Sequence, residues 1–339
     1  MVQARKKGGK AIAARPPRWN LDDLYRDPGD KSLARDLARC DVRSTAFERK
    51  YKGKLARLSG DALGKAVAEF ESIDEQLGKA ISYAQLLYAA AVSDPKVAQF
   101  HQTLSERVND ISTKLLFFSL EINRLPDTAL RQKLKAKRLA HYAPWLRDVR
   151  VWRPHELSDD MEKLLHEKGP TGRAAWNRLF DETMAGLRFP VAGRNLTSAE
   201  VFSRLSDRKS ATRKSAAVAV GKVLADNVKT FALITNTLVK DKEIEDRWRG
   251  FARPVSSRNL SNYVEDEVVD ALVSSVKKAY AKTSHRYYRM KAKWMGKKQL
   301  DHWDRNAPLP KATGRAIPWA AAKATVLSAY GAFSPTLEG

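Results

Sequence analysis

Two stretches in the first third of the chain carry apolar side chains at the spacing of an α-helix. In residues 61–91 these positions are Leu63, Val67, Phe70, Ile73, Leu77, Ile81, Ala84 and Tyr88. In residues 97–122 they are Val97, Phe100, Leu104, Val108, Ile111, Leu115, Phe118 and Ile122. A repeat of three and four residues places such positions on one side of a helix. Because only Ser93-Asp94-Pro95 separates the two stretches, we predict an antiparallel helical hairpin whose stripes pack in a core.

The rest of the chain is also mostly helical in pattern. We predict a first helix from Trp19 to about Lys50, and a proline-interrupted connector over residues 141–146. Further helices are predicted over residues 126–139, 158–168, 173–184, 207–225, 228–247 and 318–330. The longest runs from a cap at Asn262 to a stop at Gly296. Its stripe consists of Val268, Leu272, Val276, Ala279, Arg286 or Tyr287, Met290 and Trp294.

One segment alternates like a β-strand, at Leu187, Phe189 and Val191, and turn residues follow it. Thr197 and Glu200 then have the spacing of a capping box. We therefore predict a mainly α fold, a multi-helix array with one short β-hairpin. The expected organisation is a basic flexible tail (1–18), an N-terminal helical hairpin region (19–125), a small helical region with the β-hairpin (126–206) and a further helical region (207–339).

The charge of the chain is its most unusual bulk property. Lys and Arg number 62 against 39 Asp and Glu, a net charge of +23. Such a charge is the first feature expected of a nucleic-acid-binding protein. However, the basic residues beyond the tail are dispersed, and no nucleic-acid-binding motif accompanies them. We interpret the charge as solvated helix faces and expect no nucleic acid partner. An acidic missing portion of a longer protein would also account for it.

Cysteine content and hydropathy indicate a cytoplasmic protein. The only cysteine, Cys40, cannot form an intrachain disulfide, which fits a reducing compartment. The apolar run at residues 11–14 is shorter than a secretory signal requires. The densest apolar run, Leu115–Leu120, is far shorter than the ~20 residues of a membrane span. We therefore expect neither export nor membrane insertion.

The histidines do not form a recognisable zinc motif. They are His101, His141, His155, His166, His285 and His302. An H-E-x-x-H helix needs two histidines four residues apart and a glutamate that activates water. His155-Glu156 is followed by Asp159 where the second histidine belongs, and His166-Glu167 is followed by Pro170. Neither is predicted to bind zinc, and we assign no metal ligand in the chain.

Other catalytic patterns are also missing from the sequence. It contains no phosphate-binding loop, no dinucleotide-binding glycine turn and no G-x-S-x-G nucleophile elbow. Cys40 has no assigned base, and the pairs Asp22-Asp23 and Asp159-Asp160 lie near helix starts, where carboxylates favour the helix dipole. We assign no catalytic and no cofactor-binding residue.

Six landmarks occur in an order and spacing that resemble a known family. They are Trp19–Tyr25, Ala175–Glu182, Leu205–Ala216, Asn259–Asn262, His285–Lys291 and Gln299–Leu309. Together, across residues 19–310, they resemble the oligoendopeptidase F-type zinc metallopeptidases, which belong to the thimet-oligopeptidase-like family. Each landmark is weak alone, and the specificity comes from their order.

The resemblance implies a helical fold with a deep channel, in which zinc bound by H-E-x-x-H and a distal glutamate cleaves short peptides. In such sequences the motif lies well downstream of the segment that Leu300–Leu309 matches, and the 339 residues do not reach it. None of the family's zinc ligands, general base or transition-state-stabilising residues can be placed in this chain. We expect the N-terminal portion of such an enzyme, inactive without its catalytic half, in which residues 207–339 are the helical start of the catalytic domain.

The stretch His285–Pro308 is interpreted as the hinge into that catalytic half. His285 and His302 are separated by the helix stop at Gly296, and Asp301 and Asp304 lack metal-ligand partners. We expect apolar surface to be exposed on the long helix and on the final helix, causing aggregation or dependence on a partner. The alternative to the peptidase hypothesis is a free-standing basic helical module that binds nucleic acid or an acidic protein partner.

Overall fold

The computed structural model describes residues 19–310 and 317–338, so the predicted tail, residues 1–18, lies outside the described residues. Its helices confirm the predicted mainly α fold, and the one sheet among the described residues is a two-stranded antiparallel hairpin. The first half contains α1 (Lys31–Tyr51), η1 (Leu55–Arg57), α2 (Gly60–Ala90), α3 (Pro95–Thr113), α4 (Leu116–Arg124), α5 (Asp127–Lys133), α6 (Lys137–Ala140), α7 (Ala143–Arg150), η2 (Arg153–His155) and α8 (Asp159–Glu167). The second half contains α9 (Arg173–Gly186), β1 (Phe189–Val191), β2 (Arg194–Leu196), α10 (Ser198–Arg204), α11 (Ser210–Asp226), α12 (Val228–Trp248), α13 (Ser256–Ser261), α14 (Asp266–Ala279), α15 (Ser284–Trp294), η3 (His302–Asp304), α16 (Trp319–Phe333) and α17 (Pro335–Glu338).

The predicted helical hairpin is formed by α2 and α3, which pack along each other. Asp94 caps α3 by accepting a hydrogen bond from Lys96 N at 2.9 Å, and Pro95 occupies the first turn, where its missing N–H costs nothing. The two stripes meet in a core with Phe47 of α1. Ile73 and Ile111, one from each stripe, are fully buried.

The expected continuation of this second helix to Ile122 is wrong at one point, because α3 ends at Thr113 and α4 restarts at Leu116. Phe117 and Phe118, which both lie in α4, pack on Phe47 with ring centroids 5.8 and 5.1 Å away.

The first helix also begins later than predicted. Trp19 is 76% exposed and lies outside a helix, and α1 starts at Lys31 with Asp30 as its cap. Tyr25, not Trp19, anchors the segment: it is buried and its hydroxyl donates to Asp36 Oδ2 at 3.2 Å. Asp30 accepts a hydrogen bond from Ser32 N at 2.8 Å, which starts the helix here.

Two predictions for the segment after α4 need correction. The expected helix over 126–139 is two short helices, α5 and α6, and the expected connector at 141–146 contains the start of α7. Pro144 does not interrupt α7, because it lies in the first turn, where no backbone N–H is required.

The start of α2 lies close to the end of α5. At Gly60 the carbonyl of Lys133 is so near that a Cβ would clash with it.

The β-hairpin and its capping box form as predicted. Phe189 pairs with Leu196 and Val191 with Arg194. The two turn residues between the strands, Ala192 and Gly193, have φ of 50° and 76°, as a two-residue turn of this hand requires. Thr197 N donates to Glu200 Oε2 at 2.8 Å, which completes the capping box. The hairpin packs on α10 and α11 in a small core of its own.

The long helix predicted from Asn262 to Gly296 is wrong in two respects. Its N-cap is Glu265, because Asp266 accepts hydrogen bonds from Ser256 Oγ and Asn259 Nδ2 and fixes the start there. The helix is also divided into α14 and α15, because Thr283 leaves helical geometry at φ −112° and ψ −91°. The predicted stop is correct: Gly296 has φ of 68°.

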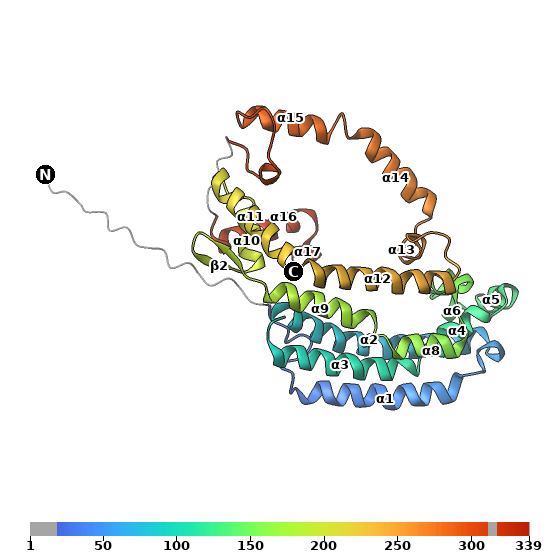
Figure 1. Cartoon of the computed structure of the whole chain (residues 1–339). Coiled ribbons are helices and arrows are strands. Elements are labelled where there is room, and N and C mark those ends of the chain that lie inside the picture. Colours follow the sequence, from blue (N-terminus) through green and yellow to red (C-terminus); the bar gives the residue numbers. More distant parts are fainter. Residues whose placement is uncertain (1–18, 311–316, 339) are drawn as a thin grey trace.

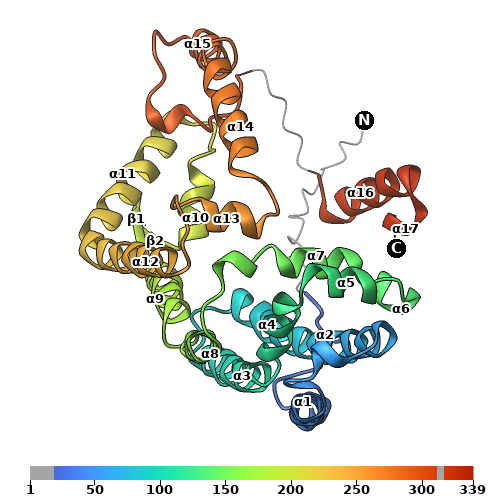
Figure 2. The ribbon, with the colours of Figure 1, turned by 90° about the vertical axis from the view of Figure 1, so that its right-hand side faces the viewer.

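The helices are arranged as a stack with an arch beside it. Figure 1 shows α1, then α2 and α3, then α8 and α9, and then α12 in successive layers, with α13, α14 and α15 curving away from α12. The rotated view shows α14 and α15 standing apart from the stacked helices (Figure 2). Among the described helices none is long and apolar enough to cross a membrane.

Candidate functional site

A groove of about 710 Å³ lies between the first layers of the stack and α12–α13. Leu116 and Leu120 of α4 form part of its apolar wall, and Leu238 of α12 lines it as well. Trp152 and Phe251 add aromatic surface, with their ring centroids 6.3 Å apart. Its other lining residues are mostly charged or polar and come from α8, α9, α12 and α13. A concave site with apolar walls and a few fixed polar groups is the usual form of a ligand-binding site.

The strongest polar contacts of this groove come from Arg249, just after α12. Its guanidinium binds Glu162 of α8 through two hydrogen bonds, at 2.6 and 3.0 Å, and Glu245 through a third at 2.7 Å. These bonds, above all those to Glu162, raise the pKa of Arg249. Burial acts to raise the pKa of Glu162, but the bonds from Arg249 outweigh it and lower that pKa. The pair therefore stays charged and ties α8 to α12.

His155 and Glu156, which begin the first incomplete H-E-x-x-H pattern, line the same groove, but both are held in structural contacts. The His155 ring stacks on Phe251 with centroids 3.8 Å apart, and its Nδ1 lies 2.8 Å from the carbonyl oxygen of Arg249. Glu156 accepts a hydrogen bond from the buried Asn123, and burial raises the pKa of Glu156. Asp159, at the position of the second histidine, pairs with Arg124 of α4.

His166 and Glu167, which begin the second incomplete H-E-x-x-H pattern, are held in similar contacts. His166 Nε2 lies 2.9 Å from Ser112 Oγ of α3, and Glu167 lies 3.7 Å from the ammonium of Lys163. Across residues 19–310 and 317–338, no three His, Cys, Asp or Glu side chains are placed to hold a metal ion. His155 and His166 thus do not fit the zinc site that the family resemblance implies, and no catalytic step can be assigned to them.

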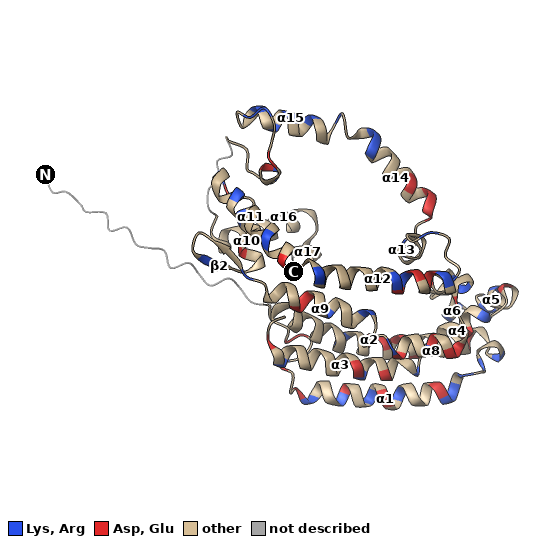
Figure 3. Cartoon of the chain, viewed as in Figure 1, with Lys and Arg blue, Asp and Glu red and all other residues tan. Residues whose placement is uncertain are grey.

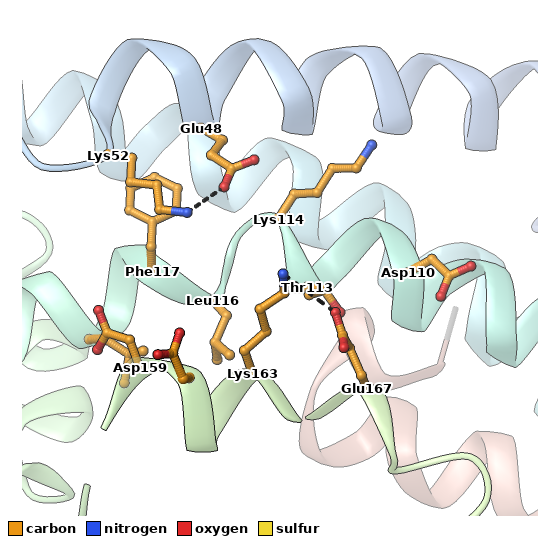
Figure 4. A pocket seen from close by; sticks show the side chains of 12 residues that line it. Glu48, Lys52, Asp110, Thr113, Lys114, Leu116, Phe117, Asp159, Lys163 and Glu167 are labelled. Carbon is orange, nitrogen blue, oxygen red and sulfur yellow. Dashed lines mark hydrogen bonds and ion pairs between the residues drawn. The ribbon is translucent and has the colours of Figure 1, made fainter. Parts of the chain in front are cut away.

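A second hollow of about 550 Å³ lies on the other side of α4, between α1, α3 and α8. Figure 4 shows Lys52 reaching Glu48 and Lys163 reaching Glu167, with Leu116 between the two pairs and Phe117 on the side of Lys52. These charges neutralise each other within the hollow, and the Lys52–Glu48 distance is 2.7 Å. The arrangement suits a hydrated surface between helices more than a reacting centre.

In the stretch His285–Pro308 both histidines are exposed, while Lys291 and Asp304 take part in a buried junction. Asp304, which is fully buried, accepts a hydrogen bond at 2.5 Å from Arg213 Nη2 of α11, itself 1% exposed. Burial acts to raise the pKa of Asp304, but hydrogen bonds from Lys297 and Arg213 outweigh it and lower that pKa. Lys291 donates to the carbonyl of Arg305 at 2.8 Å. The junction fastens α15 and η3 to α11.

Sequence reasoning missed the residues that make these contacts. Arg213 lies within the helix predicted over residues 207–225, and Arg249 follows the helix predicted over residues 228–247. Their partners are far along the chain: Arg213 is 91 residues from Asp304 and Arg249 is 87 from Glu162. No periodicity or local motif marks such pairs.

The chain has clear relatives among peptidases. Residues 121–189, which include Trp152, His155 and Glu162 of the groove lining, match the family Oligopeptidase F. Over 317 residues the chain is 25% identical to Oligopeptidase PepF of Bacillus subtilis (strain 168), covering 90% of this chain and 46% of that protein. It is a relative of the oligoendopeptidase F-type peptidases.

Solved structures confirm the predicted fold. The crystal structure of oligoendopeptidase-F from Enterococcus faecium superposes with a TM-score of 0.73 at 21% identity, covering 82% of this chain and 56% of that one. A putative oligoendopeptidase F from Bacillus anthracis str. Ames superposes with a TM-score of 0.65 at 16% identity, covering 93% and 53%. The chain thus spans about half the length of the relatives that it matches.

Proposed function

We propose that this chain is the N-terminal part of a zinc-dependent oligoendopeptidase that hydrolyses internal bonds of short peptides. The observation that carries the proposal is the similarity to an oligopeptidase over 90% of the chain. In this proposal residues 19–125 and 126–206 form a wall of the peptide channel, and residues 207–339 begin the catalytic domain. The zinc ligands and the general base belong to the part of the enzyme that corresponds to the other half of its relatives.

The groove between α8 and α12 is the surface that we assign to the peptide. Its apolar wall and aromatic edge suit side chains of an extended peptide, and Arg249 and Lys242 of its lining are already paired with the carboxylates of Glu162 and Asp246. Paired charges remain fixed when water is excluded, so they can orient a peptide without an added cost of ionisation. The chain thus contributes binding and positioning, while bond cleavage depends on the zinc-bearing part.

Peptide binding to this groove can be tested with a matched pair of substitutions on one helix. Leu238 lines the groove, whereas Leu233 of the same helix is 57% exposed and does not line it. Titration of a dye-labelled nonapeptide, followed by fluorescence anisotropy, should show Leu238→Glu weakening binding by about 10-fold, or ~1.4 kcal/mol. Leu233→Glu should change it less than about twofold. Equal effects of both substitutions would remove the groove from the proposal.

Hydrolysis is tested separately, with a quenched fluorescent peptide, zinc and a chelator. The 339-residue chain is expected to cleave nothing, because its sequence contains no H-E-x-x-H. Chelator-sensitive cleavage by the pure chain would mean that the zinc site has been placed in the wrong part of the enzyme.

Charge distribution does not favour the alternative of a general nucleic-acid-binding module. Figure 3 shows Lys and Arg interleaved with Asp and Glu along α1, α3, α8 and α12. Phosphate-binding surfaces instead gather basic side chains on one face.

A further inference from the structure

The apolar wall of the groove leads to a carboxylate. Leu116, Leu120 and Asn123 follow one another on α4 at spacings of four and three residues, which places them on one side of the helix. The two leucines line the groove, and Asn123 Nδ2 donates a hydrogen bond to Oε1 of Glu156, which lines it as well. A peptide that lies along this side of α4 therefore passes from apolar surface to the Glu156 carboxylate within about one helical turn.

A buried amide holds this carboxylate in place. Asn123 is 1% exposed, and its Oδ1 is buried with no hydrogen-bond partner in the described part of the chain. An unsatisfied amide oxygen costs stability, and departures of this kind are expected at functional sites. The bond from Asn123 uses only Oε1 of Glu156, and no residue that the structure describes donates to Oε2. Oε2 is thus left for a ligand in the groove.

The carboxylate of Glu156 also lacks a cation of its own among the described residues. The two arginines near it have other partners: Arg124 pairs with Asp159, and Arg249 binds both carboxylate oxygens of Glu162. Burial raises the pKa of Glu156, because its ionised form has lost water without full compensation. A cationic ligand would supply that compensation.

These features favour a basic side chain over other parts of a peptide. An apolar side chain would bury Glu156 further without a partner, and an acidic one would be repelled by Glu156 and Glu162. A Lys or Arg side chain instead places its methylenes on Leu120 and its charged group at Glu156 Oε2. Leu120 and Asn123 are about 4.5 Å apart along the helix axis, a distance that such a side chain spans. Although the net charge of the chain is +23, acidic side chains outnumber basic ones in the lining of this groove.

We infer that Glu156 selects peptides with Lys or Arg at one position, by accepting a hydrogen bond from the basic side chain at Oε2. The inference rests on the proposed function, because it assigns a specificity to the groove that binds the peptide. It goes beyond that function, since an apolar wall alone would not distinguish a charged side chain from a neutral one of the same shape. Asn123 is a positioning residue, which acts through its bond to Glu156.

The inference can be tested with arginine and citrulline, which have nearly the same shape but differ in charge. Two nonapeptides of Ala, Leu and Ser that differ only in this central residue are acetylated at the N-terminus and carry fluorescein at the C-terminus. In anisotropy titrations with the full chain, the Arg peptide should bind about 10-fold more tightly than the citrulline peptide, the effect expected of a charge-assisted hydrogen bond.

Glu156→Gln is the deciding variant, because glutamine keeps an oxygen that accepts from Asn123 but loses the charge. It should weaken binding of the Arg peptide about 10-fold and change that of the citrulline peptide less than about twofold. Asp241→Asn removes a carboxylate from the same groove, at an exposed position of α12, and is the matched control. It should leave the preference for Arg unchanged.

The preference should also depend on pH in the wild-type chain. As the pH falls towards the raised pKa of Glu156, the carboxylate becomes protonated, and the advantage of Arg over citrulline should shrink. In Glu156→Gln the two peptides should bind equally across the same pH range. A residue with a purely structural role would not give this difference.

Three results would overturn the inference. One is equal binding of the Arg and citrulline peptides while Leu238→Glu still weakens both, which would leave a peptide groove without this specificity. Another is a preference for Arg that Glu156→Gln leaves intact. The third is a citrulline peptide with a free N-terminus that binds as tightly as the Arg peptide and is weakened by Glu156→Gln, which would assign the carboxylate to the α-amino group.

Failure of the proposed function gives a different result. If neither peptide binds, or if Leu238→Glu and Leu233→Glu weaken binding equally, the groove is not the peptide site, and the inference fails with it.

Discussion

The helices α2 and α14 carry the same kind of apolar stripe but have opposite surroundings. In α2, Leu63 and Ile73 are fully buried against α1, α3 and α4. In α14, Leu272 is 63% exposed and no residue is buried. A stripe thus predicts a helix and its apolar side, while burial depends on whether another element lies against it. The stack has its partner elements within the chain, and the arch has them only in part.

The largest expected effect comes from the core of the stack. Phe118 is fully buried and its ring lies 5.1 Å from both Phe47 and Phe70. Phe118→Ala should lower the free energy of unfolding by ~3–5 kcal/mol, measured by urea denaturation. Leu272→Ala in the arch should change it by less than about 0.5 kcal/mol. A similar loss in both variants would mean that the arch is already covered.

A second prediction concerns how the arch is fastened to the stack. Asp304→Ala leaves Arg213 buried without its partner and should cost ~3–5 kcal/mol. Hydrogen exchange should show the loss first in α15, because the junction ties that helix to α11. The comparison variant is Asp270→Ala, which breaks the exposed pair with Arg253. It should leave exchange in α15 unchanged, and faster exchange there in both variants would contradict the role of the junction.

The third prediction is a loss of stability in alkali that belongs to the stack. Burial, together with the neighbouring Asp36, raises the pKa of Tyr25 to about 12. The unfolded tyrosine ionises near pH ~10, so the folded state binds the proton more tightly. The contribution is fully present below pH ~10 and is lost as the pH rises towards 12. Denaturation curves of Tyr25→Phe should depend less on pH in this range, and an unchanged slope would exclude this residue.

The smallest expected effect on stability is a change in association. Leu272→Gln/Val276→Gln should leave the unfolding midpoint almost unchanged, because both side chains are exposed. Light scattering and binding of a hydrophobic dye should nevertheless decrease, since the substitutions remove apolar surface. Unchanged scattering would show that aggregation, if it occurs, arises elsewhere.

Two errors of the sequence-based predictions concern the points at which a long predicted helix breaks. Periodicity could not show that the second long helix breaks before Leu116, because the apolar spacing continues across the break from Ile111 to Leu115 and Phe118. It could not show the break near Thr283 either, because α15 is positioned by Lys291, Arg213 and Asp304 from outside the helix. Local capping chemistry was predicted correctly at Thr197 and Glu200, whereas the cap at Asp30 was missed and the cap expected at Asn262 lies at Glu265.

The candidate groove depended almost wholly on contacts that sequence could not reveal. The spacing of His155 and His166 already excluded them as zinc ligands. Their contacts, with Phe251 and Ser112 respectively, are visible only in the tertiary structure. The ion pair of Glu162 with Arg249 joins residues from α8 and the end of α12. Ion pairs of this kind have no signature in composition or period, because any of many carboxylates could have been the partner.

The order of residues predicted the helix content, the β-hairpin and the helical hairpin, because local hydrogen bonding and side-chain spacing determine them. It also carried the family resemblance, through the order of the six landmarks. Tertiary structure alone decided which stripes are buried, where two long helices break, and which charges meet in the groove and the junction. These outcomes depend on contacts between residues far apart in the chain. The contrast between α2 and α14 is therefore a property of the fold, although both helices carry the same pattern.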